Sequence, residues 1–139
     1  MNDQRFPEPI VGVFILNKKN ELLLIESHKW KGLHIIPGGH VELGESLEDA
    51  VRRETLEETG LHILKPEFLC VHEYLNDGAF HKPRHFIFLE YKATAESTEV
   101  TLNEEGHAYR WTALEEALTL PTTDSVRSVI RQYLLPKTS

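Results

Sequence analysis

The chain contains a single cysteine, Cys70, among 139 residues. One cysteine excludes a disulfide framework and a structural zinc site built on cysteine ligands. The sequence also has no run of about 20 apolar residues, which excludes a helix that spans a membrane. Its first residues lack the basic start and the apolar core of a signal peptide, so we expect a cytoplasmic protein.

Basic side chains are scarce, with 15 lysines and arginines against 22 aspartates and glutamates, and the formal net charge is −7. Nucleic-acid backbones bind to basic surfaces, so we expect no nucleic-acid polymer among the partners. The acidity is concentrated in one segment. Residues 42–60 hold seven acidic and two basic side chains, and this segment therefore needs a specific explanation.

Length and patterning favour one α/β domain over residues 1–139, a mixed sheet with a helix on each side. Apolar and β-branched runs predict strands at Ile10–Asn17, Glu21–Ser27, His34–Ile36, Phe68–Leu75, His85–Ala95 and Ala108–Trp111. The first two strands form a hairpin in this prediction. After the third strand, Pro37-Gly38-Gly39 predicts a turn or a close approach of two backbones. Short helices are expected over residues 112–118 and 124–135.

A longer helix is expected over Leu47–Thr59. Ser46 is a good N-cap, and Asp49 follows it by three residues in the manner of a capping box. Gly60 is suited to end the helix because glycine adopts a left-handed backbone without strain.

One side of this helix changes character along its length. At about 100° per residue, the side expected to face the sheet begins with apolar residues and ends in carboxylates. The apolar residues are Leu47, Ala50 and Val51, and the acids are Glu54, Glu57 and Glu58. Two interpretations are open: a solvated acidic face, or a set of ligands for a divalent cation, which would relieve the repulsion between the carboxylates.

The stretch from Gly39 to Leu61 resembles the Nudix box, the pattern G-x5-E-x7-R-E-U-x-E-E-x-G-U in which U is a bulky apolar residue. Every fixed letter is present at the right spacing. Thr55 departs from the pattern because it stands where an aliphatic residue is usual. The resemblance implies an α/β/α sandwich that hydrolyses a nucleoside diphosphate linked to another group, using Mg²⁺ or Mn²⁺.

The resemblance also assigns roles within the box. It implies that Glu57 and Glu58 bind the metal together with the backbone carbonyl of Gly38, and that Glu54 is a further ligand or the base that activates water. Arg53 and Glu45 resemble the pair that braces the loop and the helix without touching the metal.

Many members of the family supply one more carboxylate from a loop outside the box. The loop before Tyr109 offers Glu105, with Glu104 as the second choice. The competing interpretation is an ordinary polar loop.

Candidates for substrate binding are less specific. Lys29, Lys31 and Arg84 could face phosphates or serve solubility alone, and Arg5 with Phe6 could clamp and stack a base. Trp30 is expected to pack rather than bind.

The expected partner is a small nucleotide, and the family resemblance also makes a homodimer one expectation. Sequence markers for NADH and ADP-ribose enzymes are absent near the box: there is no Ser-Gln-Pro-Trp run, and no proline lies within Tyr74–Gly78. These absences favour a nucleoside triphosphate or a simple nucleotide sugar, and among such sugars ADP-ribose stays one expected substrate. The alternative is a non-catalytic domain that senses a nucleotide.

Overall fold

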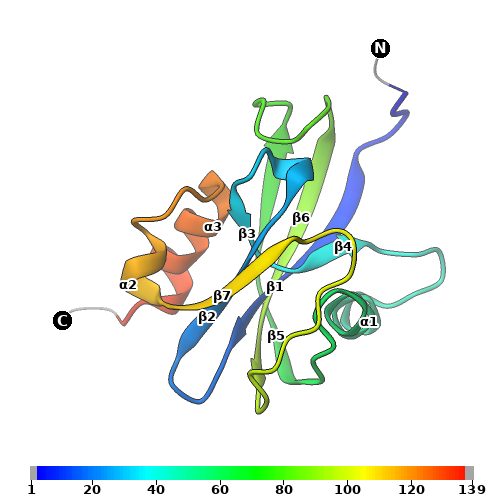
Figure 1. The fold of residues 1–139 in the computed structure, drawn as a ribbon. Helices are drawn as coiled ribbons and strands as arrows, with labels where there is room; N and C mark the ends of the chain where they lie inside the picture. Colours follow the sequence, from blue (N-terminus) through cyan, green and yellow to red (C-terminus); the bar gives the residue numbers. More distant parts are fainter. Residues whose placement is uncertain (1–2, 137–139) are drawn as a thin grey trace.

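A computed structural model describes residues 3–136 (Figure 1). The strands are β1 (Glu8–Leu16), β2 (Glu21–Glu26), β3 (His34–Ile35), β4 (Gly38–His40), β5 (Ile63–Leu75), β6 (His85–Ala95) and β7 (Ala108–Ala113). The helices are α1 (Leu47–Thr59), α2 (Leu114–Ala117) and α3 (Asp124–Val129), with a 3₁₀ turn at His28–Trp30 and a π-helical turn at Ile130–Leu134. No helix within the described residues is long and apolar enough to cross a membrane.

The sheet is mixed and has β1 at its centre. The strand order is β3-β2-β1-β6-β5, with β4 also paired to β1 and β7 paired to β2. β1 and β6 are parallel, whereas the other pairs are antiparallel. β2 and β4 share one edge of β1, because β2 pairs near Leu16 and β4 pairs with residues 10–12.

Helices cover both faces of the sheet, as Figure 1 shows. Alternate residues of a strand point to opposite faces. Val11, Val13 and Ile15 of β1 therefore pack with α1, in a core that also contains Ala50 and Val51. Phe14 and Leu16 pack on the other face with residues of α2 and α3. The predicted α/β/α sandwich with a central mixed sheet is confirmed.

Helix α1 has the bounds that its capping residues predict. The Ser46 hydroxyl accepts a hydrogen bond from the backbone N–H of Asp49 at 3.1 Å. Gly60 ends the helix with φ of 75°, and its N–H donates to the carbonyl of Leu56.

Several elements differ from the prediction. β7 continues to Ala113, so the helix expected over residues 112–118 is shortened to Leu114–Ala117. Of the two alternatives for Pro37-Gly38-Gly39, the close approach of two backbones is confirmed: Gly38 and Gly39 lie in strand β4, and a Cβ atom on Gly38 would collide with the carbonyl oxygen of Val11 in β1. β5 starts at Ile63, five residues before the predicted start, because a bulge between Leu64 and Glu67 interrupts its pairing and hides the alternation. The predicted C-terminal helix consists of α3 followed by the π-helical turn.

Candidate active site

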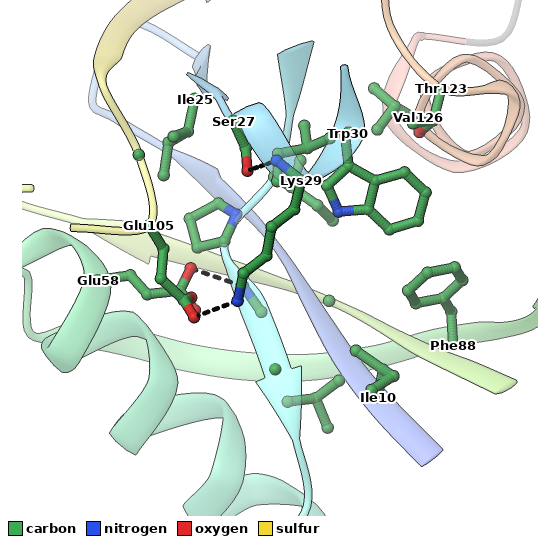
Figure 2. Close-up of a pocket in the computed structure, with 18 of the residues that line it drawn as sticks. Ile10, Ile25, Ser27, Lys29, Trp30, Glu58, Phe88, Glu105, Thr123 and Val126 are labelled. Carbon is green, nitrogen blue, oxygen red and sulfur yellow. Dashed lines mark hydrogen bonds and ion pairs between the residues drawn. The ribbon is translucent and has the colours of Figure 1, made fainter. Parts of the chain in front are cut away.

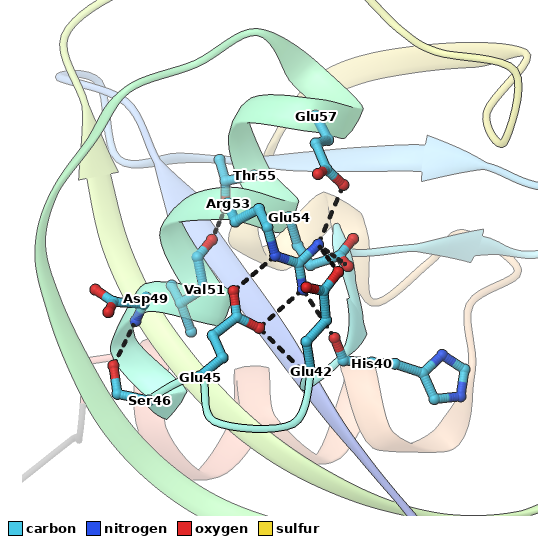
Figure 3. A network of polar contacts seen from close by, with 10 residues as sticks. All are labelled: His40, Glu42, Glu45, Ser46, Asp49, Val51, Arg53, Glu54, Thr55 and Glu57. Atoms are coloured by element: carbon cyan, nitrogen blue, oxygen red, sulfur yellow. Dashed lines mark hydrogen bonds and ion pairs between the residues drawn. The ribbon is translucent and has the colours of Figure 1, made fainter.

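Arg53 joins helix α1 to the loop that precedes it (Figure 3). Its Nε and Nη2 donate to the two carboxylate oxygens of Glu45 at 2.7 and 3.0 Å, and Nη2 also donates to the carbonyl of His40 at 3.0 Å. Nη1 contacts Glu54 at 2.9 Å and Glu57 at 3.2 Å. One guanidinium group therefore positions the loop and two of the acids of the box.

The electrostatics of this cluster follow from the pairing. The hydrogen bond from Arg53, aided by the backbone N–H of Glu42, lowers the pKa of Glu45 from 4.5 to about 2. The same bond raises the pKa of Arg53. Glu45 is thus ionised throughout the physiological range, which suits the bracing role that the resemblance implies.

Glu54 and Glu58 turn inward toward the glycines of β4. A Cβ atom on Gly39 would collide with the carboxyl group of Glu54, and the N–H of Gly38 donates to Oε1 of Glu58 at 3.3 Å. Oε2 of Glu58 is buried and has no hydrogen-bond partner among the described residues. Burial, together with the nearby carboxyl group of Glu54, raises the pKa of Glu58.

Glu57 does not share the buried side of the helix, and this part of the prediction is wrong. Its side chain is 54% exposed, whereas that of Glu54 is 12% exposed. In the last two turns the buried side is centred on Thr55, Glu58 and Thr59, so Glu57 lies outside it.

Thr55, the departure from the box pattern, is fully buried. Its hydroxyl donates to the carbonyl of Val51 at 2.8 Å, one turn earlier in the helix. The polar group is therefore satisfied locally, and threonine occupies the usual aliphatic position without an unpaired donor.

A pocket of about 970 Å³, a volume that includes its open mouth, begins beside Glu58 and extends to α3. It has a polar end and an aromatic end (Figure 2). The polar end is lined by Ser27, Lys29, Gly38, Glu58, Asn103 and Glu105. The aromatic end is lined by Ile10, Trp30, Phe80, Phe86, Phe88 and Val126. Such a division suits a ligand with one charged part and one planar apolar part.

Glu105 and Glu104 differ in their position relative to the pocket. Oε1 of Glu105 accepts a hydrogen bond from Lys29 Nζ at 2.9 Å, and both side chains line the polar end of the pocket. Glu104 is exposed and does not line it. The choice between the two acids therefore favours Glu105 on geometry.

The other proposed substrate-binding residues are not brought to this pocket. Arg5, Phe6 and Arg84 line a separate hollow beside the N-terminal segment, where Arg84 pairs with Asp3 at 2.9 Å. Lys31 is exposed on the turn after Trp30 and lines neither hollow. Of the four basic candidates, only Lys29 reaches the polar end.

Several lining residues were missed by the sequence analysis. Trp30 packs against Phe80, with ring centroids 4.7 Å apart, and lines the pocket as well. Phe88 and Glu90 of β6 line it together, because alternate residues share a face. The available signal was Glu90 itself, a charged residue inside an apolar strand.

The donor set fits a hard divalent cation. No three acidic, histidine or cysteine side chains within residues 3–136 converge into a ready metal site, because Glu54 and Glu57 contact Arg53 and Glu105 contacts Lys29. However, the unpaired buried oxygen of Glu58 beside Glu54 is a costly arrangement for the bare protein. A cation bound by oxygen ligands would remove that cost.

Comparisons with known proteins agree with this chemistry. A family model of the NUDIX domain matches residues 7–133. The chain is 31% identical over 121 residues to the asymmetrical bis(5'-nucleosyl)-tetraphosphatase of Mus musculus, covering 84% of this chain and 80% of that protein. It is 51% identical over 49 residues to an ADP-ribose pyrophosphatase of Methanocaldococcus jannaschii, covering 34% of this chain and 29% of that protein.

The fold has a solved counterpart. The structure of a MutT NUDIX hydrolase from Burkholderia pseudomallei matches with a TM-score of 0.79 and 29% identity, over 93% of this chain and 99% of that chain. With the family model covering most of the chain and the box residues gathered at one end of a pocket, the chain belongs to the Nudix family and is a hydrolase that acts on acid anhydrides.

Proposed function

We propose that this enzyme hydrolyses a pyrophosphate bond in a nucleoside diphosphate linked to another group, and that the reaction depends on Mg²⁺ or Mn²⁺. The observation that carries the proposal is the buried, unpaired Oε2 of Glu58. It belongs to a residue that lines the polar end of a pocket whose other end is aromatic.

The cation would be held by Glu54, Glu57, Glu58 and Glu105, with the carbonyl of Gly38. When bound, it supplies positive charge to the phosphates and lowers the pKa of a water molecule. The protein's own residues bind and orient. Lys29 presents an ammonium group to the phosphates. Arg53 and Glu45 hold α1 and the loop before it in a fixed relative position.

The net negative charge of the chain explains why a cation, and not the acidic side chains themselves, must supply positive charge to the phosphates. A pyrophosphate would be repelled by four carboxylates unless a cation intervened. The acidic segment is therefore the feature that binds a phosphate substrate indirectly, although it argues against binding nucleic-acid backbone.

For the substrate, we propose a nucleoside triphosphate or a simple nucleotide sugar such as ADP-ribose, in the cytoplasm. Support comes from the two-ended pocket, and from relatives whose names specify a bis(5'-nucleosyl) tetraphosphate and ADP-ribose.

The test is a substrate panel with product analysis. The purified protein is incubated with nucleoside triphosphates, dinucleoside polyphosphates and nucleotide sugars, each with Mg²⁺ or Mn²⁺. Products are separated by ion-exchange chromatography, and ¹⁸O-labelled water identifies the phosphorus that is attacked. Turnover that chelation abolishes supports the proposal. Tight nucleotide binding without turnover across the panel would instead identify a sensor domain.

A further inference from the structure

Glu90 is a buried carboxylic acid that the proposed reaction does not use. It lies in the middle of β6 and is only 2% exposed, although it lines the pocket. On the same face of β6, Phe86 and Phe88 line the aromatic end. The small accessible part of Glu90 thus belongs to the pocket wall.

The neighbouring strand is shaped to accommodate this carboxyl group. The parallel register of β1 and β6 sets Gly12 beside Glu90. A Cβ atom on Gly12 would collide with Oε1 of Glu90 and would lie 3.1 Å from Cδ1 of Ile36. A glycine in the interior of a central strand weakens the strand, because it has no side chain to pack and loses more backbone entropy on folding. Because Gly12 has no side chain, it leaves the space in which the Glu90 carboxyl group lies.

Nothing in the described protein satisfies the Glu90 carboxyl group. Within residues 3–136 it forms no hydrogen bond and no ion pair. Burial alone raises its pKa to about 8, so the group is mostly neutral at pH 7. A structural acid in a core is normally paired, because an unpaired buried polar group is destabilising. A ligand that enters the pocket would provide the missing partners.

A neutral carboxyl group offers one donor and one acceptor side by side. Its complement is a planar edge that carries an acceptor nitrogen next to an amino donor, as the adenine edge does with N7 and N6. The O–H of the neutral acid would donate to such a ring nitrogen, and its carbonyl oxygen would accept from the adjacent amino group. The aromatic side chains nearby, among them Trp30 and Phe88, would pack against such a ring.

We propose that Glu90 is the specificity-determining residue of the pocket, binding an edge of the nucleobase on which a ring nitrogen lies beside an amino group, while the pyrophosphate lies at the polar end. This rests on the proposed function for the placement of the phosphates. The placement of Glu90 in the pocket wall, its isolation and the matching glycine do not depend on it.

The experiment compares two probes that differ only in the amino group. Binding of adenosine 5'-monophosphate and of purine riboside 5'-monophosphate, which lacks that group, is measured by calorimetry in the presence of a chelator. The proteins are the wild type, Glu90→Gln, Glu90→Leu and the control Glu67→Gln, an exposed acid on β5. Glutamine keeps a donor and an acceptor in the same shape, whereas leucine has neither.

We expect the wild type and Glu67→Gln to prefer the adenine probe by about 10- to 100-fold, because an unmade buried hydrogen bond is costly. Glu90→Gln should retain most of that preference, and Glu90→Leu should bind the two probes equally. Circular dichroism establishes that each variant is folded.

Four outcomes would overturn the proposal. The first three are equal binding of the two probes by the wild type, an unchanged preference in Glu90→Leu, and no binding of either probe. A preference for inosine 5'-monophosphate that depends on Glu90 would also overturn it, since that base presents an amide edge. The assay involves no turnover. A substrate panel without hydrolysis would therefore refute the proposed function while leaving the Glu90 result to be judged separately.

Discussion

Lys29 and Glu105, 76 positions apart in the chain, form an ion pair of 2.9 Å at the polar end of the pocket. Both side chains are about half exposed, at 50% and 44%. Such a pair contributes little to stability, so its value lies in where it places the two charges. It brings the loop before β7 and the turn after β2 to the same side of Glu58, as Figure 2 shows.

Glu105→Gln should therefore lower kcat by about 10-fold or more, because it removes one of the charges proposed to hold the cation. Glu104→Gln is the matched control, since Glu104 is the adjacent acid and does not line the pocket. Steady-state kinetics with the best substrate of the panel measures both. Equal effects of the two substitutions would contradict the assignment of Glu105.

Glu57→Gln should reduce turnover on the order of 100-fold and leave the fold intact. The side chain is 54% exposed, and exposed substitutions usually change the free energy of unfolding by less than about 0.5 kcal/mol. Glu48→Gln, on the same helix and also exposed, should leave turnover unchanged. Wild-type turnover in Glu57→Gln would show that this acid is not a ligand.

Arg53→Lys should lower activity by about 10- to 100-fold, as substitution of residues that orient metal ligands commonly does. A lysine keeps the charge but cannot contact both oxygens of Glu45 together with Glu54 and Glu57. Arg52→Lys is the control, because among residues 3–136 Arg52 pairs with a single acid, Glu48.

The same substitution has a consequence for acid stability. The folded pKa of Glu45 lies near 2, below its ordinary 4.5, so its pairing stabilises the fold above pH 4.5 and is lost as the pH falls toward 2. Acid unfolding followed by circular dichroism should therefore begin at a higher pH in Arg53→Lys than in Arg52→Lys. Coincident acid transitions would contradict this role of Arg53.

Mn²⁺ or Mg²⁺ should raise the melting temperature of the wild type by several degrees, because an ion that binds only the folded state stabilises it. The double variant Glu57→Gln/Glu58→Gln should lose this shift, whereas Glu48→Gln should keep it. Differential scanning fluorimetry with and without a chelator measures the effect. A wild type that does not respond to either cation would favour a purely structural acidic helix.

Glu90 should make the protein less stable as the pH rises. Its pKa is raised from 4.5 to about 8 in the folded state, so between these values the folded protein holds a proton that the unfolded chain releases. The free energy of unfolding then falls by up to about 1.4 kcal/mol per pH unit, and the loss is complete above pH 8.

Urea unfolding at pH 5.5 and 7.5, in chelator, should show this difference in the wild type and in Glu67→Gln. Glu90→Gln, which cannot titrate, should reduce the difference by about 2 kcal/mol. Glu58 has a raised pKa too, but it is present in all three proteins, so their comparison isolates Glu90. If the free energy of unfolding of Glu90→Gln changes with pH as much as that of the wild type, then Glu90 does not hold a proton in the folded state that the unfolded chain releases.

Local chemistry explains why much of this protein could be predicted. The predicted bounds of helix α1 are confirmed at both ends, because Ser46 and Gly60 act on backbone groups within the same turn. The bounds of β5 were not predicted, since the bulge after Leu64 depends on pairing with β6. The prediction that Glu57 faces the sheet is wrong. Helical spacing gives the direction of each side chain around the helix axis, but it does not say which part of the helix surface another element covers.

The amino-acid sequence by itself determined the family, the sandwich and the acids of the box, because those depend on short spacings and on alternation along single elements. Only the tertiary structure decided that Lys29 meets Glu105, that Arg84 turns to Asp3, and that Glu90 lies in a space left by Gly12. Each of these joins residues that are distant in the chain. Their proximity is a product of strand order and register, which no local pattern encodes.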